Sequence, residues 1–185
     1  MRYLSSISLA LLVHVLLSIV VLMALACTAK PVEMWEYGKS VDPMTDTVMQ
    51  IAMADAVSGE GKYGDPIDLA VSCISSTAIV AIGWGSFIGM DPTFKHKQEV
   101  TLRWDSTDAI SSAWELGSDR DTVDNTMLFD SESESFVKDM LRHDQLIARV
   151  TPYSGSSLTA TFDLTGLEEA IKPLYEGSPG LRLSN

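Results

Sequence analysis

The chain has few of the side chains that most often carry catalysis or hold metal ions. It contains two cysteines and three histidines in 185 residues. Neither His96 nor His143 stands at a metal-ligand spacing with another His or Cys, so neither a zinc nor a copper site is predicted. The Gly-x-Ser-x-Gly elbow of many serine hydrolases is absent. Cys73 lies in an apolar strand pattern, where a thiolate nucleophile is disfavoured. These absences favour a protein that is not an enzyme and has no cofactor.

Basic residues are also scarce. Acidic residues number 25 against 13 basic ones, which gives a formal net charge of -12. Nucleic acids and anionic headgroups need a basic surface, so neither is expected as a partner. A basic protein partner remains compatible with this charge, although solubility alone explains it more simply. Asp-rich segments, such as the one around Asp42 and Asp46, are interpreted as turns with solvated charges rather than calcium sites.

The first 26 residues have the pattern of an export signal. Arg2 precedes an apolar run over residues 3–26, which closes with Ala24, Leu25 and Ala26 before Cys27. A positive start, an apolar stretch and small residues at the end define a signal peptide. The sequence therefore predicts that residues 1–26 direct the remaining chain to the cell envelope.

Three fates remain open for this segment. The Ala-Leu-Ala-Cys boundary resembles a lipobox, so lipidation of Cys27 is the favoured interpretation, with residues 27–33 as a tether. The second is an uncleaved membrane anchor, because the run is near the ~20 residues that span a bilayer. The third is a secreted form with a Cys27–Cys73 disulfide. Thr28 after the cysteine favours an outer-membrane lipoprotein facing the periplasm or the surface; inner-membrane anchoring is the alternative.

Alternating apolar and polar residues dominate the chain after the tether. This period of two, interrupted by turn signals, is typical of β-strands. We expect one β-rich domain over residues 34–176, followed by a flexible tail at 177–185. Strands are predicted at 34–37, 47–55, 67–73, 77–84, 100–104, 111–116, 123–129, 146–151 and 158–164. The predicted fold is an antiparallel β-sandwich or curved sheet of about eight strands with two C-terminal helices.

Two helices are predicted from capping boxes near the C-terminus. The first box begins at Ser131, and its helix is expected to end near His143. The second begins at Thr165, and Pro173 is expected to kink or shorten its helix. A Gly-rich loop is predicted over residues 59–66.

The chain after the tether resembles the TagO/VasI family of accessory proteins associated with type VI secretion systems. The resemblance runs from about Trp35 to Leu174. It rests on the order of four blocks: an early Trp with residues 42–46, residues 69–73 with an apolar strand ending at Trp84, residues 100–105 with Trp114, and residues 158–167. It implies an envelope-located, non-catalytic accessory protein that supports a secretion apparatus. Residues 119–125 look like extra length relative to this family.

The predicted interaction residues are Trp84, Gly85, Asp119, Asp121 and Asp124. Glycines near Trp84 allow close approach of another backbone, although core packing of the tryptophans and an ordinary bend at the glycines are the simpler interpretations. An envelope protein partner is expected. Two alternatives remain: a phage- or plasmid-encoded surface protein that excludes competitors, and an envelope hydrolase that uses His96 or His143 with a nearby carboxylate.

Overall fold

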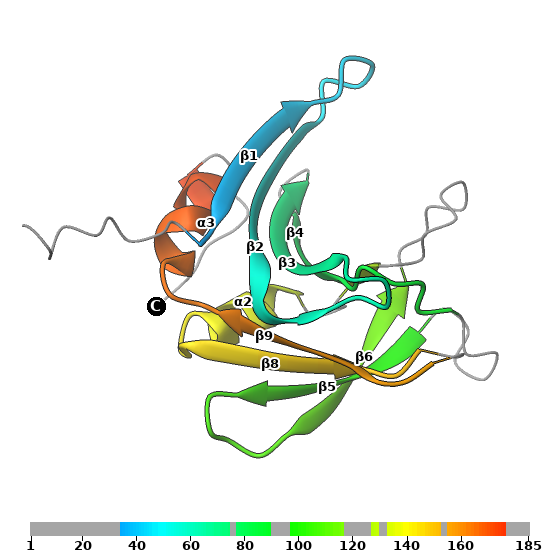
Figure 1. Cartoon of the computed structure of the whole chain (residues 1–185). Coiled ribbons are helices and arrows are strands. Elements are labelled where there is room, and N and C mark those ends of the chain that lie inside the picture. Colours follow the sequence, from blue (N-terminus) through cyan, green and yellow to red (C-terminus); the bar gives the residue numbers. More distant parts are fainter. Residues whose placement is uncertain are drawn as a thin grey trace, which may run out of the picture. The chain divides into compact units, whose positions relative to one another are not determined.

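The computed structural model describes residues 34–74, 77–89, 97–116, 127–129, 133–152 and 155–176. All of them lie in one compact unit, Glu33–Asn185. The elements in chain order are β1 (Glu36–Val41), β2 (Val48–Glu60), β3 (Pro66–Ile74), β4 (Thr77–Gly83), β5 (Lys97–Trp104), β6 (Ile110–Leu116), β7 (Met127–Phe129), α2 (Ser133–Met140), β8 (Gln145–Val150), β9 (Leu158–Asp163) and α3 (Leu167–Glu176). Figure 1 shows their arrangement.

The strands form one curled antiparallel sheet. Its nine strands follow the order β1-β2-β3-β4-β7-β6-β5-β8-β9. The far end of β2 also pairs with β9, at Ser58 and Thr161, so the sheet curls back on itself like a half-barrel. The predicted mainly β fold, with a curved antiparallel sheet and two helices near the C-terminus, is therefore confirmed.

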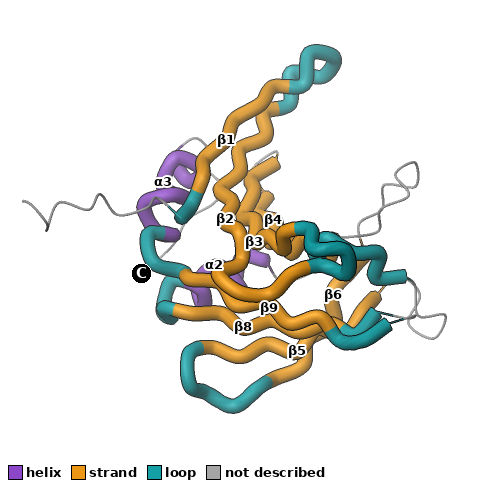
Figure 2. Tube along the Cα trace, viewed as in Figure 1, coloured by secondary structure: helices purple, strands orange, loops and turns teal. Residues whose placement is uncertain are grey.

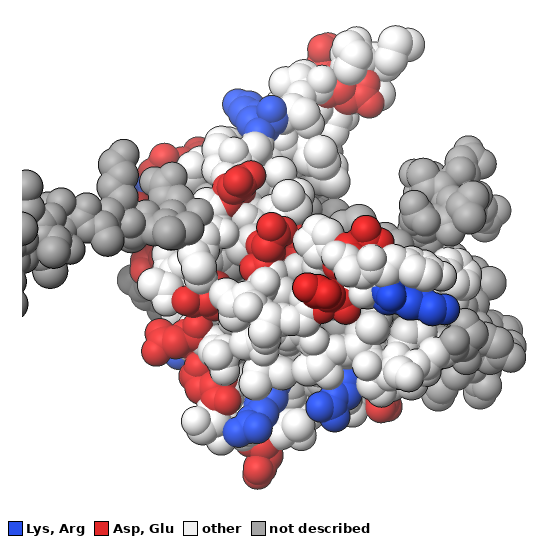
Figure 3. Space-filling model, viewed as in Figure 1, with Lys and Arg blue, Asp and Glu red and all other residues white. Residues whose placement is uncertain are grey.

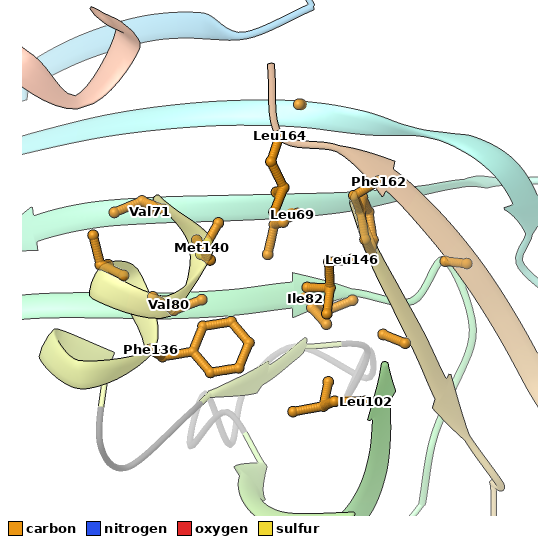
Figure 4. Packing of buried hydrophobic residues seen from close by; sticks show 14 of the residues in the cluster. Leu69, Val71, Val80, Ile82, Leu102, Phe136, Met140, Leu146, Phe162 and Leu164 are labelled. Carbon is orange, nitrogen blue, oxygen red and sulfur yellow. The ribbon is translucent and has the colours of Figure 1, made fainter. Parts of the chain in front are cut away.

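The concave side of the sheet holds the hydrophobic core. Alternate residues of β2 to β6, β8 and β9 contribute to it, together with one face of each helix. Figure 4 shows ten labelled core residues: Leu69, Val71, Val80, Ile82, Leu102, Phe136, Met140, Leu146, Phe162 and Leu164. Trp84, Trp104 and Trp114 are also buried. Packing against Phe136 positions two of them, because its ring lies 5.1 Å from that of Trp104 and 5.3 Å from that of Trp114.

Strand β2 is longer than the sequence predicts. Residues 59 and 60, assigned to a loop, are still strand, and the loop covers only residues 61–65. An irregularity in the β2–β3 register between Asp55 and Glu60 bends the strand toward β9. Gly59 has φ 104°, and a Cβ there would lie 2.2 Å from the carbonyl oxygen of Thr159. This glycine therefore permits contact between two strands rather than a turn.

Helix α2 begins and ends differently from its prediction. The predicted cap residue Ser131 lies outside the described residues. Ser133, the first helical residue, is buried, and its Oγ accepts a hydrogen bond from the Val80 N–H at 2.9 Å. The helix ends at Met140 instead of near His143. A turn follows, in which the His143 N–H donates a hydrogen bond to the Met140 carbonyl at 3.4 Å.

Pro173 was expected to kink helix α3 or to end it early; the helix continues past Pro173 to Glu176, so the early end does not occur. Pro173 removes one helical hydrogen bond and crowds the preceding turn. The helix persists because Ile171 and Leu174, on either side of the proline, are both buried in the core. Burial of two such side chains offsets the roughly 3 kcal/mol that an interior proline costs.

Candidate functional site

The convex side of strands β1 to β4 carries an unusual number of apolar side chains. We call it the outer face. On β2 the alternation is regular: Gln50, Ala52 and Ala54 are buried in the core, and the residues between them point the other way. Those residues are Met49, Ile51 and Met53. Met49 and Met53 are 39% and 37% exposed, respectively.

The strand register continues this apolar surface across β3 and β4. Residues opposite each other in an antiparallel pair share a face of the sheet. Met49 lies opposite Ile74, Ile51 opposite Ser72, and Met53 opposite Ala70. On β4, Ile79 lies opposite Ser72 and Ala81 opposite Ala70. Five large apolar side chains therefore stand around small ones: Met49, Ile51, Met53, Ile74 and Ile79.

Both described helices pack on the other side of the sheet. Helix α3 contacts β1, β2 and β3, and α2 contacts β4. Their buried apolar residues all belong to the core cluster on the concave side. Within the described part of the chain, the outer face therefore has no helix over it.

Two carboxylates stand at one end of the outer face. Asp55 of β2 lies directly opposite Asp68 of β3. The Asp68 carboxyl lies over Gly83, where an added Cβ would come within 2.5 Å of its Oδ1. Partial burial, followed by the negative charge of Asp55, raises the pKa of Asp68 to about 6. Like charges directly opposite each other destabilise a sheet, and among the described residues no cation forms an ion pair with either carboxylate.

The outer face ends at β1, an edge strand. Among the described strands, β1 pairs only with β2. The β1–β2 hairpin projects from the rest of the sheet, as Figures 1 and 2 show. Asp42 holds its tip in shape, because its Oδ1 accepts hydrogen bonds from the N–H groups of Met44 and Thr45 at 2.7 and 3.2 Å. The tip presents Met44, which is 89% exposed.

Negative charge prevails over the protein as a whole. Figure 3 shows acidic side chains spread over the visible surface, with basic ones at fewer places. This distribution agrees with the formal net charge of -12 for the whole chain. A positively charged partner is therefore attracted to the protein at long range.

The structure places two of the predicted interaction residues inside the fold. Trp84 is fully buried, so its side chain packs in the core and is not available to a partner. Gly85 has φ 54°, and a Cβ there would lie 2.7 Å from the carbonyl oxygen of Pro66. The close backbone approach expected at this glycine therefore occurs within the chain. The neighbouring Ser86 Oγ accepts a hydrogen bond from the Lys62 N–H, which holds the same two loops together.

The other predicted site residues lie outside the described residues. These are Cys27, Asp119, Asp121 and Asp124. His96 also lies outside them. Cys73 is buried in β3, as expected for a small apolar side chain. The described part holds no group of three His, Cys, Asp or Glu side chains that could bind a metal ion, and neither of its helices has the length and apolar character to cross a membrane.

A second polar site joins Asp105 and His143, which are distant in the sequence. His143 Nδ1 and Asp105 Oδ2 are hydrogen-bonded at 2.8 Å. Asp105 Oδ1 also accepts from the N–H groups of Asp144 and Gln145, at 3.1 and 2.9 Å. The bond to His143, followed by the two backbone bonds, holds the pKa of Asp105 below its usual value. The His143 ring stacks on Trp104 with 5.2 Å between ring centroids.

The sequence also contains one spacing that is found around nucleophilic serines in some enzymes. Ser135 and Lys138 of α2 have the Ser-x-x-Lys spacing. Both face outward from the helix rather than into a site, and Lys138 Nζ lies 3.5 Å from Glu134 Oε1. This i,i+4 ion pair is an ordinary feature of an exposed helix surface, and it gives no support to a catalytic role for Ser135.

Comparisons with known proteins identify the fold and no more. No protein-family model matches the chain, and no curated protein matches its sequence. The crystal structure of invasion associated protein B from Bartonella henselae has a similar fold, with a TM-score of 0.52 and 12% sequence identity. The match covers 79% of this chain and 94% of that protein. At this identity the likeness extends to the arrangement of strands alone.

Proposed function

We propose that the protein is a non-enzymatic binding module of the bacterial cell envelope that recognises a protein partner through the outer face. One observation carries this proposal: five large apolar side chains gather on a sheet face that no described helix covers. Apolar surface of this kind on a soluble domain marks sites of interaction. Two of the five are methionines, whose flexible side chains adapt to a partner's shape.

The cellular role follows from the N-terminal sequence and the family resemblance. Lipidation of Cys27 attaches the domain to the outer membrane, or an uncleaved segment anchors it to the inner membrane. The resemblance to the TagO/VasI family makes components of a type VI secretion apparatus the first partners to test. The protein then serves as an accessory that supports this apparatus.

Site-specific crosslinking in living cells tests the proposal. A photoreactive amino acid replaces Met53 on the outer face in one strain and Ile110 in another. Ile110 is a suitable control because it is also an exposed apolar side chain, at 52%, but begins β6. We expect Met53 to capture a discrete envelope protein that Ile110 does not capture. Capture of the same proteins from both positions, or of none from Met53, would contradict the proposal.

A hydrolase is the second candidate, and the Asp105–His143 pair is the observation that favours it. A carboxylate that orients a histidine and is itself fixed by backbone N–H groups is the support found in catalytic triads. Within the described residues, however, Asp105 is the only side chain hydrogen-bonded to His143. A His143→Ala variant decides between the candidates. Loss of the protein's cellular activity while crosslinking at Met53 stays intact would support the hydrolase. Unchanged cellular activity would exclude a hydrolase that uses His143.

A further inference from the structure

We propose that the segment bound on the outer face is an amphipathic α-helix of the partner protein, with an Arg or Lys that lies against Asp55 and Asp68. This inference rests on the proposed function and names the chemistry of the partner.

The width of the outer face selects a helix over an added strand. Neighbouring strands lie about 4.8 Å apart, so β2 to β4 span roughly 10 Å. A helix with its side chains is about 10 Å across and covers this width. A strand added at the edge of β1 would lie next to Gly38 and Ser40. Strands β1 and β2 would separate it from Ile74, and β3 would also separate it from Ile79. It would leave these isoleucines uncovered.

The length of the face sets the length of the helix. From Met49 to Asp55 the face extends about 20 Å along β2, at roughly 3.3 Å per residue. A helix rises about 1.5 Å per residue, so about 13 residues cover this distance. The fold already uses such packing on its concave side. There α3 places Leu167, Ile171 and Leu174, one every three or four residues, in the core beside β1, β2 and β3.

The charges at one end of the face identify the polar residue of the partner. Asp55 and Asp68 lie opposite each other without a described cation near enough for an ion pair. Their repulsion costs free energy in the unbound protein, and a basic side chain from the partner removes it. A helix with an Arg at the end over these carboxylates also satisfies them with hydrogen bonds. Apolar surface and charge therefore select the same ligand.

Synthetic peptides test the inference on the purified full-length protein. The first peptide has about 14 residues, with Leu at positions i, i+3, i+4 and i+7 and one Arg at its end. A second peptide has the same composition with Leu at every other position, which favours a strand. A third replaces Arg with Glu. Fluorescence anisotropy measures the affinity of each. We expect the helical Arg peptide to bind, and the other two to bind at least roughly tenfold more weakly.

Variants of the protein locate the binding. We expect two variants, Asp55→Asn/Asp68→Asn and Met53→Asp, each to lower the affinity for the helical peptide by roughly tenfold or more. The matched control, Asp108→Asn/Glu169→Gln, removes the same charge from exposed positions elsewhere and should leave the affinity unchanged. Met49→Asp also places a charge on the apolar surface, and it replaces Met53→Asp in the test if that variant does not fold.

Three outcomes overturn the inference. Tighter binding of the alternating peptide would identify strand addition at β1. An equal loss of affinity in both double variants would show that the peptide responds only to the net charge of the protein. An affinity that none of the variants changes would place the peptide elsewhere. None of them touches the crosslinking result at Met53, so the proposed function stands or falls separately.

Discussion

At the scale of single residues, two aspartates show how the fold treats the same side chain in opposite ways. Asp105 accepts hydrogen bonds from a histidine and two backbone N–H groups, so its ionised form is favoured. Asp68 is partly buried beside the like charge of Asp55, so its ionised form is disfavoured. The first carboxylate stabilises the fold and the second destabilises it. An unfavourable charge that persists beside an apolar surface is expected where binding, rather than stability, selects the residue.

Replacing Asp68 with Asn should therefore stabilise the protein at neutral pH. The folded pKa of about 6 lies above the ordinary value of 3.8, so ionisation of Asp68 opposes folding. This destabilisation is fully present above about pH 6 and is absent below pH 3.8. Because solvent screens a carboxyl that is partly exposed, we expect a gain of about 1 kcal/mol in unfolding free energy at pH 7.5. Urea unfolding of both proteins between pH 3.5 and 8 measures it, and an Asp68→Asn gain that persists at pH 3.5 would contradict this origin.

Replacing Asp105, in contrast, should destabilise the protein at neutral pH. Its backbone has φ 43°, a conformation that Asn tolerates better than Ala. Asp105→Ala leaves two N–H groups and His143 without their acceptor, so we expect a lower thermal midpoint for Asp105→Ala than for Asp105→Asn. The folded pKa of Asp105 lies below 3.8, so its contribution is present above about pH 4 and is lost as the pH falls through the folded pKa. Thermal melts at pH 7 and pH 3 measure this. A gap between wild type and Asp105→Asn that does not shrink in acid would refute the assignment.

At the scale of elements, most strands could be predicted from the sequence, and their ends could not. Apolar and polar residues alternate within 97–104 and within 145–150, and such a local pattern predicts a strand without knowledge of the rest of the fold. The end of β2 depends instead on β9, about one hundred residues later in the chain. Gly59 has a loop-forming residue type, yet its position is set by the Thr159 backbone against it. The same limit hides the Asp105–His143 pair, because only the fold brings β5 beside β8.

Gly59→Ala tests whether this contact holds the curled sheet together. A Cβ at Gly59 would lie 2.2 Å from a backbone oxygen that cannot move without shifting β9. Gly166 is the matched control, because it has φ 84° but nothing within 4 Å of an added Cβ. We expect Gly166→Ala to cost about 1 kcal/mol for its positive φ alone. Gly59→Ala should cost roughly 3 kcal/mol or more. Equal unfolding free energies for the two variants would show that the β2–β9 contact is not tight in solution.

At the scale of the whole molecule, the proposed binding surface could be predicted only in part from the sequence. The apolar alternation of β2 is visible in the sequence, where Met49, Ile51 and Met53 share one face. Which face lies outward is not visible, because it depends on where the helices pack. The sequence-based choice of Trp84 illustrates this, since a large aromatic side chain suits both a core and an interface. Only the fold, which buries Trp84 and exposes Met49, separates the two roles.

The last prediction concerns how the whole chain is held in the cell. If Cys27 is lipidated, Cys27→Ser should move the protein from the membrane fraction to the soluble fraction, or leave an unprocessed precursor of higher mass. Loss of the lipid should matter, because a diacyl chain contributes about 0.8 kcal/mol for every CH₂ group that it buries in the membrane. Fractionation and intact-mass measurement follow both forms, and Cys73→Ser is the control because Cys73 is buried in β3. A Cys27→Ser protein that remains in the membrane at the wild-type mass would show an uncleaved anchor. In that case residues 1–26 keep the protein at the inner membrane, and the partner should be sought there.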